Sequence, residues 1–337
     1  MELINKFSDE LENLRIKLDD YIKVQDRIIN AIKEKTVRTV YTRGSIYNFT
    51  PFFEECLGDK CNGKIISGDN LRDDDRRYSY DSENRVIMIE KYSSFLNMIR
   101  IDSIFLYHGD SSEQILFSGS DMCTLKMLLC SDGKCKYLLT YGKNNPKGQK
   151  KSIQEFIYLN DTLAKIYSQW ENGKHWIQEF YYKNDKLILI RAVADNGFSM
   201  IDYSTARPDF KKIRELIYYG LLEKIKDRKN NFTAIGIEGF LDQNNPHFCV
   251  CFDISDNQSE YLAEWDEVSD AIELFDFYFN DSQMKKCVKI IAEVIIQLFN
   301  EGKIIKNKFY FHQSQVSIQK LYRNIRKLFL DAGIEIL

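Results

Sequence analysis

The feature that most constrains the fold of this chain is a repeat of 24 residues near its middle. Residues 153–163 return as residues 177–187, and eight of the eleven positions are identical. Each copy carries an Asn-Asp pair, and Asn172-Gly173 lies between the copies; both dipeptides favour the left-handed backbone of a tight hairpin turn. The period therefore corresponds to two strands and two turns. Because two-residue turns join only antiparallel strands, we expect an antiparallel β-meander over residues 77–205.

The first hairpin of this region, residues 78–89, resembles the tyrosine–aspartate (YD) hairpin repeat of Rhs-type proteins. That repeat has the pattern Tyr-x-Tyr-Asp-x-x-Gly-Arg-Leu. The positions that match it are Tyr78, Tyr80, Asp81 and Arg85, whereas Asn84 and Val86 stand where Gly and Leu are usual. Later hairpins lose the Asp after the second Tyr. The resemblance covers about a third of the chain and implies a hairpin architecture.

Residues 1–35 have the pattern of one long amphipathic helix. Between residues 3 and 34, a seam recurs at alternating spacings of four and three, as in a heptad repeat. The seam consists of Phe7, Leu11, Leu14, Leu18, Tyr21, Gln25, Ile28 and Ile32. Two arrangements satisfy this pattern: a homodimer through the helix, or a helix that packs on its own domain. The Tyr and the Gln in the seam favour the second arrangement.

Residues 206–337 predict a separate α+β domain with helices on one side of a small sheet, so the expected fold class of the chain is α+β. Residues 36–76, between the first helix and the meander, contain scattered Gly and Pro, and we expect an irregular connection there, with a strand pattern only at 37–41. The elements expected in the last domain are a helix from Pro208, strands at about 232–240, 247–254 and 304–311, and helices at about 267–279, 282–301 and 315–331.

Composition and motifs argue against several classes of function. No segment approaches 18 uninterrupted apolar residues and no signal peptide is visible, so we expect no membrane span and a cytoplasmic location. The eight cysteines show no Cys-x-x-Cys spacing, which favours free, buried thiols over a zinc site. Nucleotide-binding glycine loops and serine-nucleophile motifs are absent. We therefore expect no cofactor, no metal and no enzyme activity; an enzymatic site would need the fold to bring His108 or His175 to several carboxylates.

The net charge is −3, but the charges are unevenly distributed along the chain. From Asn230 to Met284 there is no Lys or Arg and there are twelve acids, so this window has a formal charge of −12. Either the acids pair with the basic residues that flank the window, or they form an exposed acidic face that attracts a basic protein. In the second case we expect the partner-binding residues to be Glu260, Tyr261, Glu264, Trp265, Asp266, Glu267 and Asp270.

The order helix, two strands, acidic loop and long helices, together with Glu264-Trp265, resembles immunity proteins of bacterial polymorphic toxin systems. The resemblance implies a non-catalytic protein-binding module that neutralises a basic toxin domain. We expect no direct contact of the chain with nucleic acid. Two alternatives stay open. A structural or self-assembling scaffold would use the hairpin sheet and the first helix, and an enzyme would use a site assembled from dispersed residues.

The acidic-face hypothesis predicts a salt-sensitive interaction. A variant in which Glu260, Glu264 and Trp265 are replaced by Ala should lose a basic partner that the wild-type chain captures, because charge attraction and the aromatic anchor are removed together. Pull-downs from a lysate of the source cell at low and moderate salt measure this difference. Equal capture by both chains would place the interface on another part of the chain.

Overall fold

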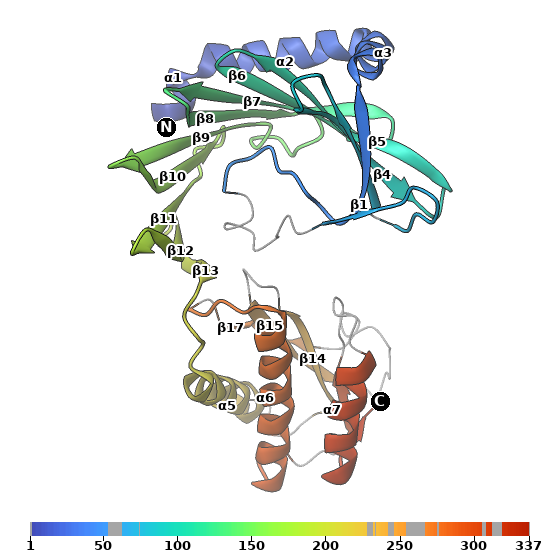
Figure 1. Cartoon of the computed structure of the whole chain (residues 1–337). Helices are drawn as coiled ribbons and strands as arrows, with labels where there is room; N and C mark the ends of the chain where they lie inside the picture. Colours follow the sequence, from blue (N-terminus) through green and yellow to red (C-terminus); the bar gives the residue numbers. More distant parts are fainter. Residues whose placement is uncertain are drawn as a thin grey trace. The chain divides into compact units, whose positions relative to one another are not determined.

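A computed structural model gives the fold of the chain (Figure 1). It describes residues 2–52, 63–73, 75–227, 232, 234–241, 246–253, 267–274, 276–304, 308–311 and 319–336. The chain divides into two compact units, Met1–Phe198 and Ser199–Leu337. None of the helices in the described part of the chain combines the length and the apolarity needed to cross a membrane.

The larger sheet confirms the expected antiparallel meander. It contains 13 strands among the described residues, in the order β13-β12-β11-β10-β9-β8-β7-β6-β5-β4-β3-β1-β2. Consecutive strands are neighbours along almost the whole sheet, which is what short turns impose. The strands are β1 (Arg38–Arg43), β2 (Lys64–Ile66), β3 (Asp75–Tyr80), β4 (Val86–Ser93), β5 (Met98–His108), β6 (Ser111–Ser118), β7 (Asp121–Ser131), β8 (Lys134–Gly142), β9 (Lys151–Leu159), β10 (Thr162–Trp170), β11 (His175–Lys183), β12 (Lys186–Ala194) and β13 (Ser199–Ser204).

Tight turns with a left-handed backbone close three of these hairpins. The turn residues Asp132-Gly133, Asn160-Asp161 and Asn184-Asp185 all have positive φ, between 49° and 72°. Two consecutive positive φ values are typical of a type I′ turn, whose twist matches the twist of the two strands that it joins. Asn, Asp and Gly tolerate this backbone with little strain, so the sequence places these turns directly.

Each of these three hairpins also contains a β-bulge in its second strand. The pairing skips Lys136 in β8, Ala164 in β10 and Ile188 in β12. Each skipped residue lies three positions after the second turn residue. A bulge bends its strand and increases the local twist, and Figure 1 shows that the strands of the first unit form a strongly curved sheet.

Three helices cover one face of the curved sheet, which we call the helix face (Figure 1). They are α1 (Glu2–Lys6), α2 (Ser8–Lys23) and α3 (Gln25–Lys35). One continuous helix over residues 3–34 is therefore not confirmed. The chain leaves helical geometry at Val24, where φ is −120° and ψ is 25°, and the Val24 N–H donates a hydrogen bond to the Tyr21 carbonyl, one residue nearer than in an α-helix.

The seam of the N-terminal helices packs against the sheet of its own unit. Leu11, Leu14 and Leu18 are almost completely buried. The buried cluster consists of Phe7, Leu11, Leu14, Leu18 and Ile32 from the helices and Ile87, Met88, Ile104, Ile115, Met122, Leu125, Leu139, Tyr141 and Ile153 from the strands. The alternative in which this helix packs on its own domain is the arrangement present here, and a homodimer through the helices would have to use other residues.

A buried carboxylate fixes the position of α2 on the helix face. The Glu113 side chain of β6 is 1% exposed, pairs with Lys17, and accepts a hydrogen bond of 2.8 Å from the Tyr21 hydroxyl. Burial, and then the hydrogen bond to Glu113, raise the pKa of the Tyr21 phenol above its ordinary value. Because both partners belong to α2, a slide of the helix along the sheet would leave a charge buried without a partner.

The opposite face of the sheet, which we call the loop face, is covered in part by the segment that follows β1 (Figure 1). The rings of Tyr47 and Phe49 pack against Phe105, with centroids 5.3 Å and 5.8 Å away. The Ile46 N–H donates a hydrogen bond of 3.2 Å to the hydroxyl of Tyr78, which is itself completely buried. Both faces of the sheet thus contribute to the core of the first unit.

The described parts of residues 36–76, which are 36–52, 63–73 and 75–76, are more regular than the expected irregular connection. β1 pairs with β3 over six residues and with β2 over three, so this segment extends the sheet. Arg43 on β1 forms an ion pair of 3.1 Å with the buried Asp75 of β3. A buried carboxylate needs a charged partner, and the pairing of β1 with β3 places Arg43 beside Asp75.

The second unit has mixed α+β structure, and it begins at Ser199, before the expected start of the last domain at residue 206. Its sheet has the order β16-β15-β14-β18-β19, with β17 also paired to β15. β14 is antiparallel to β15 and parallel to β18. Besides β13, its elements are α5 (Phe210–Asp227), β14 (Ala234–Leu241), β15 (Pro246–Asp253), β16 (Glu267–Val268), β17 (Ile272–Glu273), α6 (Asp281–Asn300), β18 (Lys308–Phe311), α7 (Gln319–Asp331) and β19 (Glu335–Ile336).

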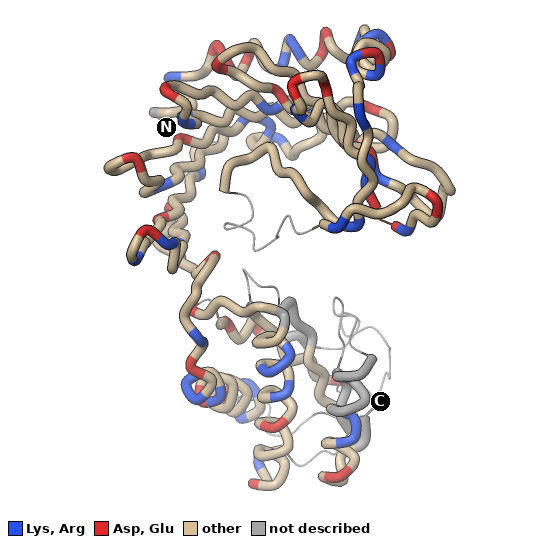
Figure 2. The backbone as a smooth tube through the Cα atoms, in the orientation of Figure 1, with Lys and Arg blue, Asp and Glu red and all other residues tan. Residues whose placement is uncertain are grey.

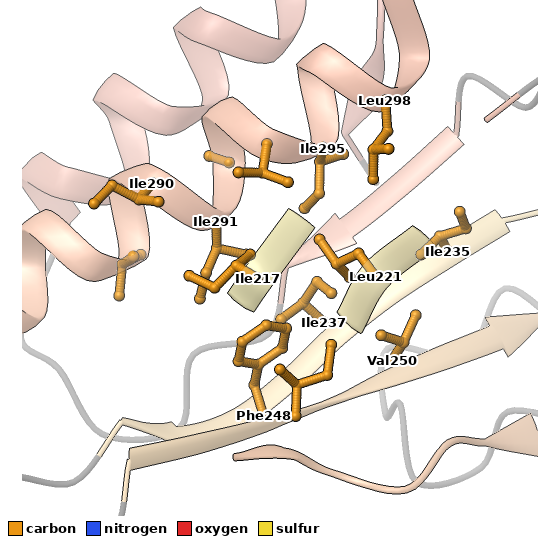
Figure 3. Close-up of a cluster of buried hydrophobic side chains, with 14 of the residues drawn as sticks. Ile217, Leu221, Ile235, Ile237, Phe248, Val250, Ile290, Ile291, Ile295 and Leu298 are labelled. Carbon is orange, nitrogen blue, oxygen red and sulfur yellow. The ribbon is translucent and has the colours of Figure 1, made fainter. Parts of the chain in front are cut away.

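A hydrophobic core of aliphatic and aromatic side chains joins the helices of this unit to its sheet (Figure 3). α5 and α6 contribute residues at helical spacing, and β14 and β15 contribute alternate residues. The labelled residues in Figure 3 are Ile217, Leu221, Ile235, Ile237, Phe248, Val250, Ile290, Ile291, Ile295 and Leu298.

The prediction of a helix at about 267–279 is wrong. β16 and β17 occupy this stretch, and Ile272, Leu274, Phe277 and Phe279 are buried while Glu273 is exposed. The burial follows the two-residue alternation of an extended chain more closely than a helical period. Helix begins only after Asn280, where a reciprocal capping box with Gln283 satisfies the first backbone N–H groups.

We predict that the contact between α2 and the sheet stabilises the first unit. Leu11→Ala should lower its free energy of unfolding by about 2–5 kcal/mol, because Leu11 is fully buried and the sheet cannot close the cavity. Ile16→Ala, at a position that is 45% exposed on the same helix, should change it by less than about 0.5 kcal/mol. Urea unfolding followed by tryptophan fluorescence measures both variants, and equal effects would contradict this packing.

Candidate functional site

A cavity of about 310 Å³ opens on the loop face of the first unit. Strands β7 to β11 form its floor, and the segment after β1 forms part of its rim. The residues that line it are Thr50, Pro51, Lys126, Leu138, Thr140, Ser152, Ile153, Gln154, Ile166, Ser168, Trp170 and Gln178. Most of the polar side chains among them belong to strands. Polar side chains along one face of a sheet indicate that this face is accessible to solvent.

The register of the meander brings these polar side chains into rows. Lys126 of β7 pairs with Thr140 of β8, Thr140 pairs with Ser152 of β9, and Ser152 pairs with Trp170 of β10. Side chains that are directly opposite on neighbouring strands project from the same face. The four residues therefore form one continuous row across the cavity floor.

A second row lies beside the first. Leu138 pairs with Gln154, and Gln154 pairs with Ser168. The Gln154 amide donates a hydrogen bond of 3.1 Å to the Ser168 hydroxyl, which fixes the orientation of both groups. The cavity thus combines hydroxyl and amide groups with an apolar wall that includes Leu138 and Ile166.

Lys126 is the charged group of this cavity. Burial lowers the pKa of its ammonium group from the ordinary lysine value of 10.5. Among the described residues, no carboxylate pairs with it and no acceptor forms a hydrogen bond to it. A cation that is partly removed from water without a counter-charge costs free energy of folding, and such groups are concentrated at binding and catalytic sites.

His108 and His175, the two histidines considered above for an enzymatic site, lie away from this cavity. His108 of β5 is on the helix face, with its Nε2 atom 3.7 Å from the carboxylate of Glu113. His175 of β11 stacks on Tyr167, with the ring centroids 5.5 Å apart. Both therefore belong to the face covered by helices, and neither meets Lys126.

Most of the partner-binding residues expected from the acidic window lie outside the described residues. This applies to Glu260, Tyr261, Glu264, Trp265 and Asp266. Glu267 belongs to β16, and Asp270 is fully exposed, 4.0 Å from the ammonium group of Lys224 on α5. Lys and Arg residues are spread along α5 and α6, together with some acidic residues (Figure 2). The acidic face stays a prediction, because most of its expected residues lie outside the described ranges.

Within the described ranges, no three His, Cys, Asp or Glu side chains are grouped to hold a metal ion. Cys123, Cys130, Cys135, Cys249, Cys251 and Cys287 are all free thiols; Cys56 and Cys61 lie outside these ranges. Comparisons of the chain with protein-family models, with curated proteins and with solved structures find no match.

Sequence reasoning missed the cavity, although one signal was present. Lys126 interrupts a run of apolar residues, Leu125 to Leu129, inside a strand. The alternation of a strand places residue 126 on the face opposite to the buried Leu125. A lysine there indicates only a wet face, because the cover provided by the segment after β1 cannot be inferred from this pattern.

We predict that Lys126 reduces the stability of the free protein. Lys126→Met should raise the free energy of unfolding at pH 7 by about 1–3 kcal/mol, because a partly buried charge without a partner is removed. The pKa of Lys126 is lower in the folded chain than in the unfolded chain. The destabilisation by Lys126 is therefore complete at pH values at which its amine is protonated in both states. It disappears as the pH rises through the window between the lowered pKa and 10.5.

Denaturant unfolding from pH 7 to pH 11 measures this effect. Lys147→Met, at an exposed loop position, is the matched control and should change the free energy of unfolding by less than about 0.5 kcal/mol. A loss of stability in Lys126→Met would contradict the absence of a counter-charge.

Proposed function

We propose that this chain is a non-catalytic binding protein and that the loop-face cavity holds a carboxylate group of its ligand. The observation that supports this most directly is the Lys126 ammonium group, which lines the cavity without a counter-charge among the described residues. A bound carboxylate would supply that charge and form a charge-assisted hydrogen bond.

The groups around Lys126 suit a carboxylate better than a neutral ligand. The hydroxyls of Thr140 and Ser152 stand in the same row and can donate to the second carboxylate oxygen. The apolar wall, with Leu138 and Ile166, would cover the carbon skeleton attached to that carboxylate. A cavity of about 310 Å³ is at the lower end of the size range of small-molecule sites, so a ligand of metabolite or side-chain size fits best.

The toxin-neutralising role is a separate proposal that rests on the acidic window. It is supported by the twelve acids between Asn230 and Met284 and by the exposure of Asp270. A protein-binding surface in the second unit and a ligand cavity in the first unit are compatible, because they use different residues. A self-assembling scaffold and an enzyme with a dispersed site stay alternatives.

We predict that small carboxylates stabilise the wild-type chain through Lys126. Sodium acetate, succinate and glutamate, at concentrations tenfold above the dissociation constant, should raise the free energy of unfolding by about 1.4 kcal/mol relative to matched sodium chloride. Lys126→Met should weaken the tightest of them by at least about tenfold, because one charge-assisted hydrogen bond is lost. Thermal unfolding and isothermal titration calorimetry measure both effects.

Two further variants make the test decisive. Lys147→Met removes an exposed lysine and should leave the affinity unchanged. Glu54, Glu55 and Asp59 lie outside the described residues, and their triple amide variant tests whether an acid of the chain itself competes for Lys126. Carboxylate affinity that is equal in wild type and Lys126→Met, in both the native and the triple amide background, would overturn the proposal.

A further inference from the structure

Two cysteines face each other at the end of the hairpin formed by β7 and β8. Cys130 and Cys135 are register partners, directly after the pair Ser131 and Lys134 that flanks the Asp132-Gly133 turn. Their Sγ atoms are 3.6 Å apart, and the Cys130 thiol donates a weak hydrogen bond to the Cys135 sulfur. Both residues are partly exposed.

The backbone geometry of this pair suits a cross-strand disulfide. The Cys130 N–H donates to the Asp110 carbonyl, 2.8 Å away on the side of β6, and not to β8. In an antiparallel ladder this makes Cys130 and Cys135 a non-hydrogen-bonded pair, in which the Cα atoms approach to about 4.5 Å. That separation lies within the range of about 4.4–6.8 Å that disulfides require. Rotation of the two side chains is therefore sufficient to bring the sulfurs to bonding distance.

We propose that Cys130 and Cys135 are a reversible oxidation site, at which a small disulfide such as glutathione disulfide converts the two thiols into one cross-strand disulfide. The site is independent of the proposed carboxylate ligand, since it is defined by the sulfur geometry alone.

The reaction proceeds by two thiol–disulfide exchanges. One cysteine loses its proton and attacks a sulfur of glutathione disulfide; the S–S bond of the oxidant breaks, and one glutathione leaves as a thiolate that takes up a proton. The second cysteine then loses its proton and attacks the protein sulfur of the mixed disulfide, which releases the second glutathione. In total the two cysteines lose two protons and two electrons, and one glutathione disulfide is reduced to two glutathione molecules.

The surroundings of the sulfurs affect the rate of this exchange. Burial, and then the hydrogen bond from Cys130, raise the pKa of the Cys135 thiol to about 12. Because the thiolate is the reacting form, oxidation should be slow at pH 7 and should accelerate as the pH rises.

The hairpin is also connected to its neighbour. Lys134 forms an ion pair with Asp161, in the turn between β9 and β10. Cys130 follows Lys126 on the same strand and on the same face of the sheet, four residues further along. A disulfide would therefore fix the end of β7 that leads away from the cavity.

The test is oxidation of the folded full-length chain by mixtures of oxidised and reduced glutathione. Free thiols are then blocked with iodoacetamide, and tryptic peptides are mapped by mass spectrometry. We expect a peptide pair that joins Cys130 to Cys135 with a loss of two hydrogens. The equilibrium constant for formation of this disulfide should be at least about tenfold higher in the folded chain than in 6 M guanidinium chloride, because the fold already holds the sulfurs close together.

Two variants serve as controls. Cys123→Ser removes a partly exposed thiol in β7 and should leave the product unchanged, whereas Cys130→Ser should abolish it. Circular dichroism of both variants verifies that the sheet is intact. A stable mixed disulfide of Cys130 or Cys135 with glutathione, a bond from either residue to another cysteine, or an equilibrium constant no higher than in guanidinium chloride would each overturn the proposal.

Discussion

A two-residue turn fixes the register of the hairpin that it closes, and the first unit depends on this constraint. Asn160-Asp161 and Asn184-Asp185 have positive φ at both positions, so the strands on either side can pair in only one register. Register then decides which side chains share a face. The bulges at Ala164 and Ile188, three residues after these turns, shift the alternation once in each hairpin and bend the strands.

The curvature of the sheet gives its two faces different roles. On the helix face, Leu11, Leu14 and Leu18 close a dry core, and Glu113 ties α2 to β6 through Lys17 and Tyr21. On the loop face, the segment after β1 covers Phe105 and continues to Thr50 and Pro51, at the rim of the cavity. Because this cover is a loop, it leaves space above the strands. Lys126 is the one charged side chain among the described residues that line this space.

The candidate site was not predictable from the sequence, for a physical reason. Lys126, Thr140, Ser152 and Trp170 are separated by up to 44 residues, and only the register of four strands aligns them. The residues of the acidic window are neighbours in sequence. Their charge density can therefore be counted without knowledge of the fold. Charge density does not reveal exposure, however, and the only member whose side chain is described, Asp270, is both exposed and 4.0 Å from a lysine.

The sequence by itself determined the local features of this protein: the antiparallel meander, the turns at Asn160-Asp161 and Asn184-Asp185, and the α+β character of the second unit. These depend on backbone preferences and on periodicity, which act over a few residues. Tertiary structure alone decided that the N-terminal seam packs on the sheet, that the helix expected at 267–279 is extended, and that Lys126 has no described counter-charge. Those outcomes depend on which distant surfaces meet, since burial and pairing are properties of the folded whole.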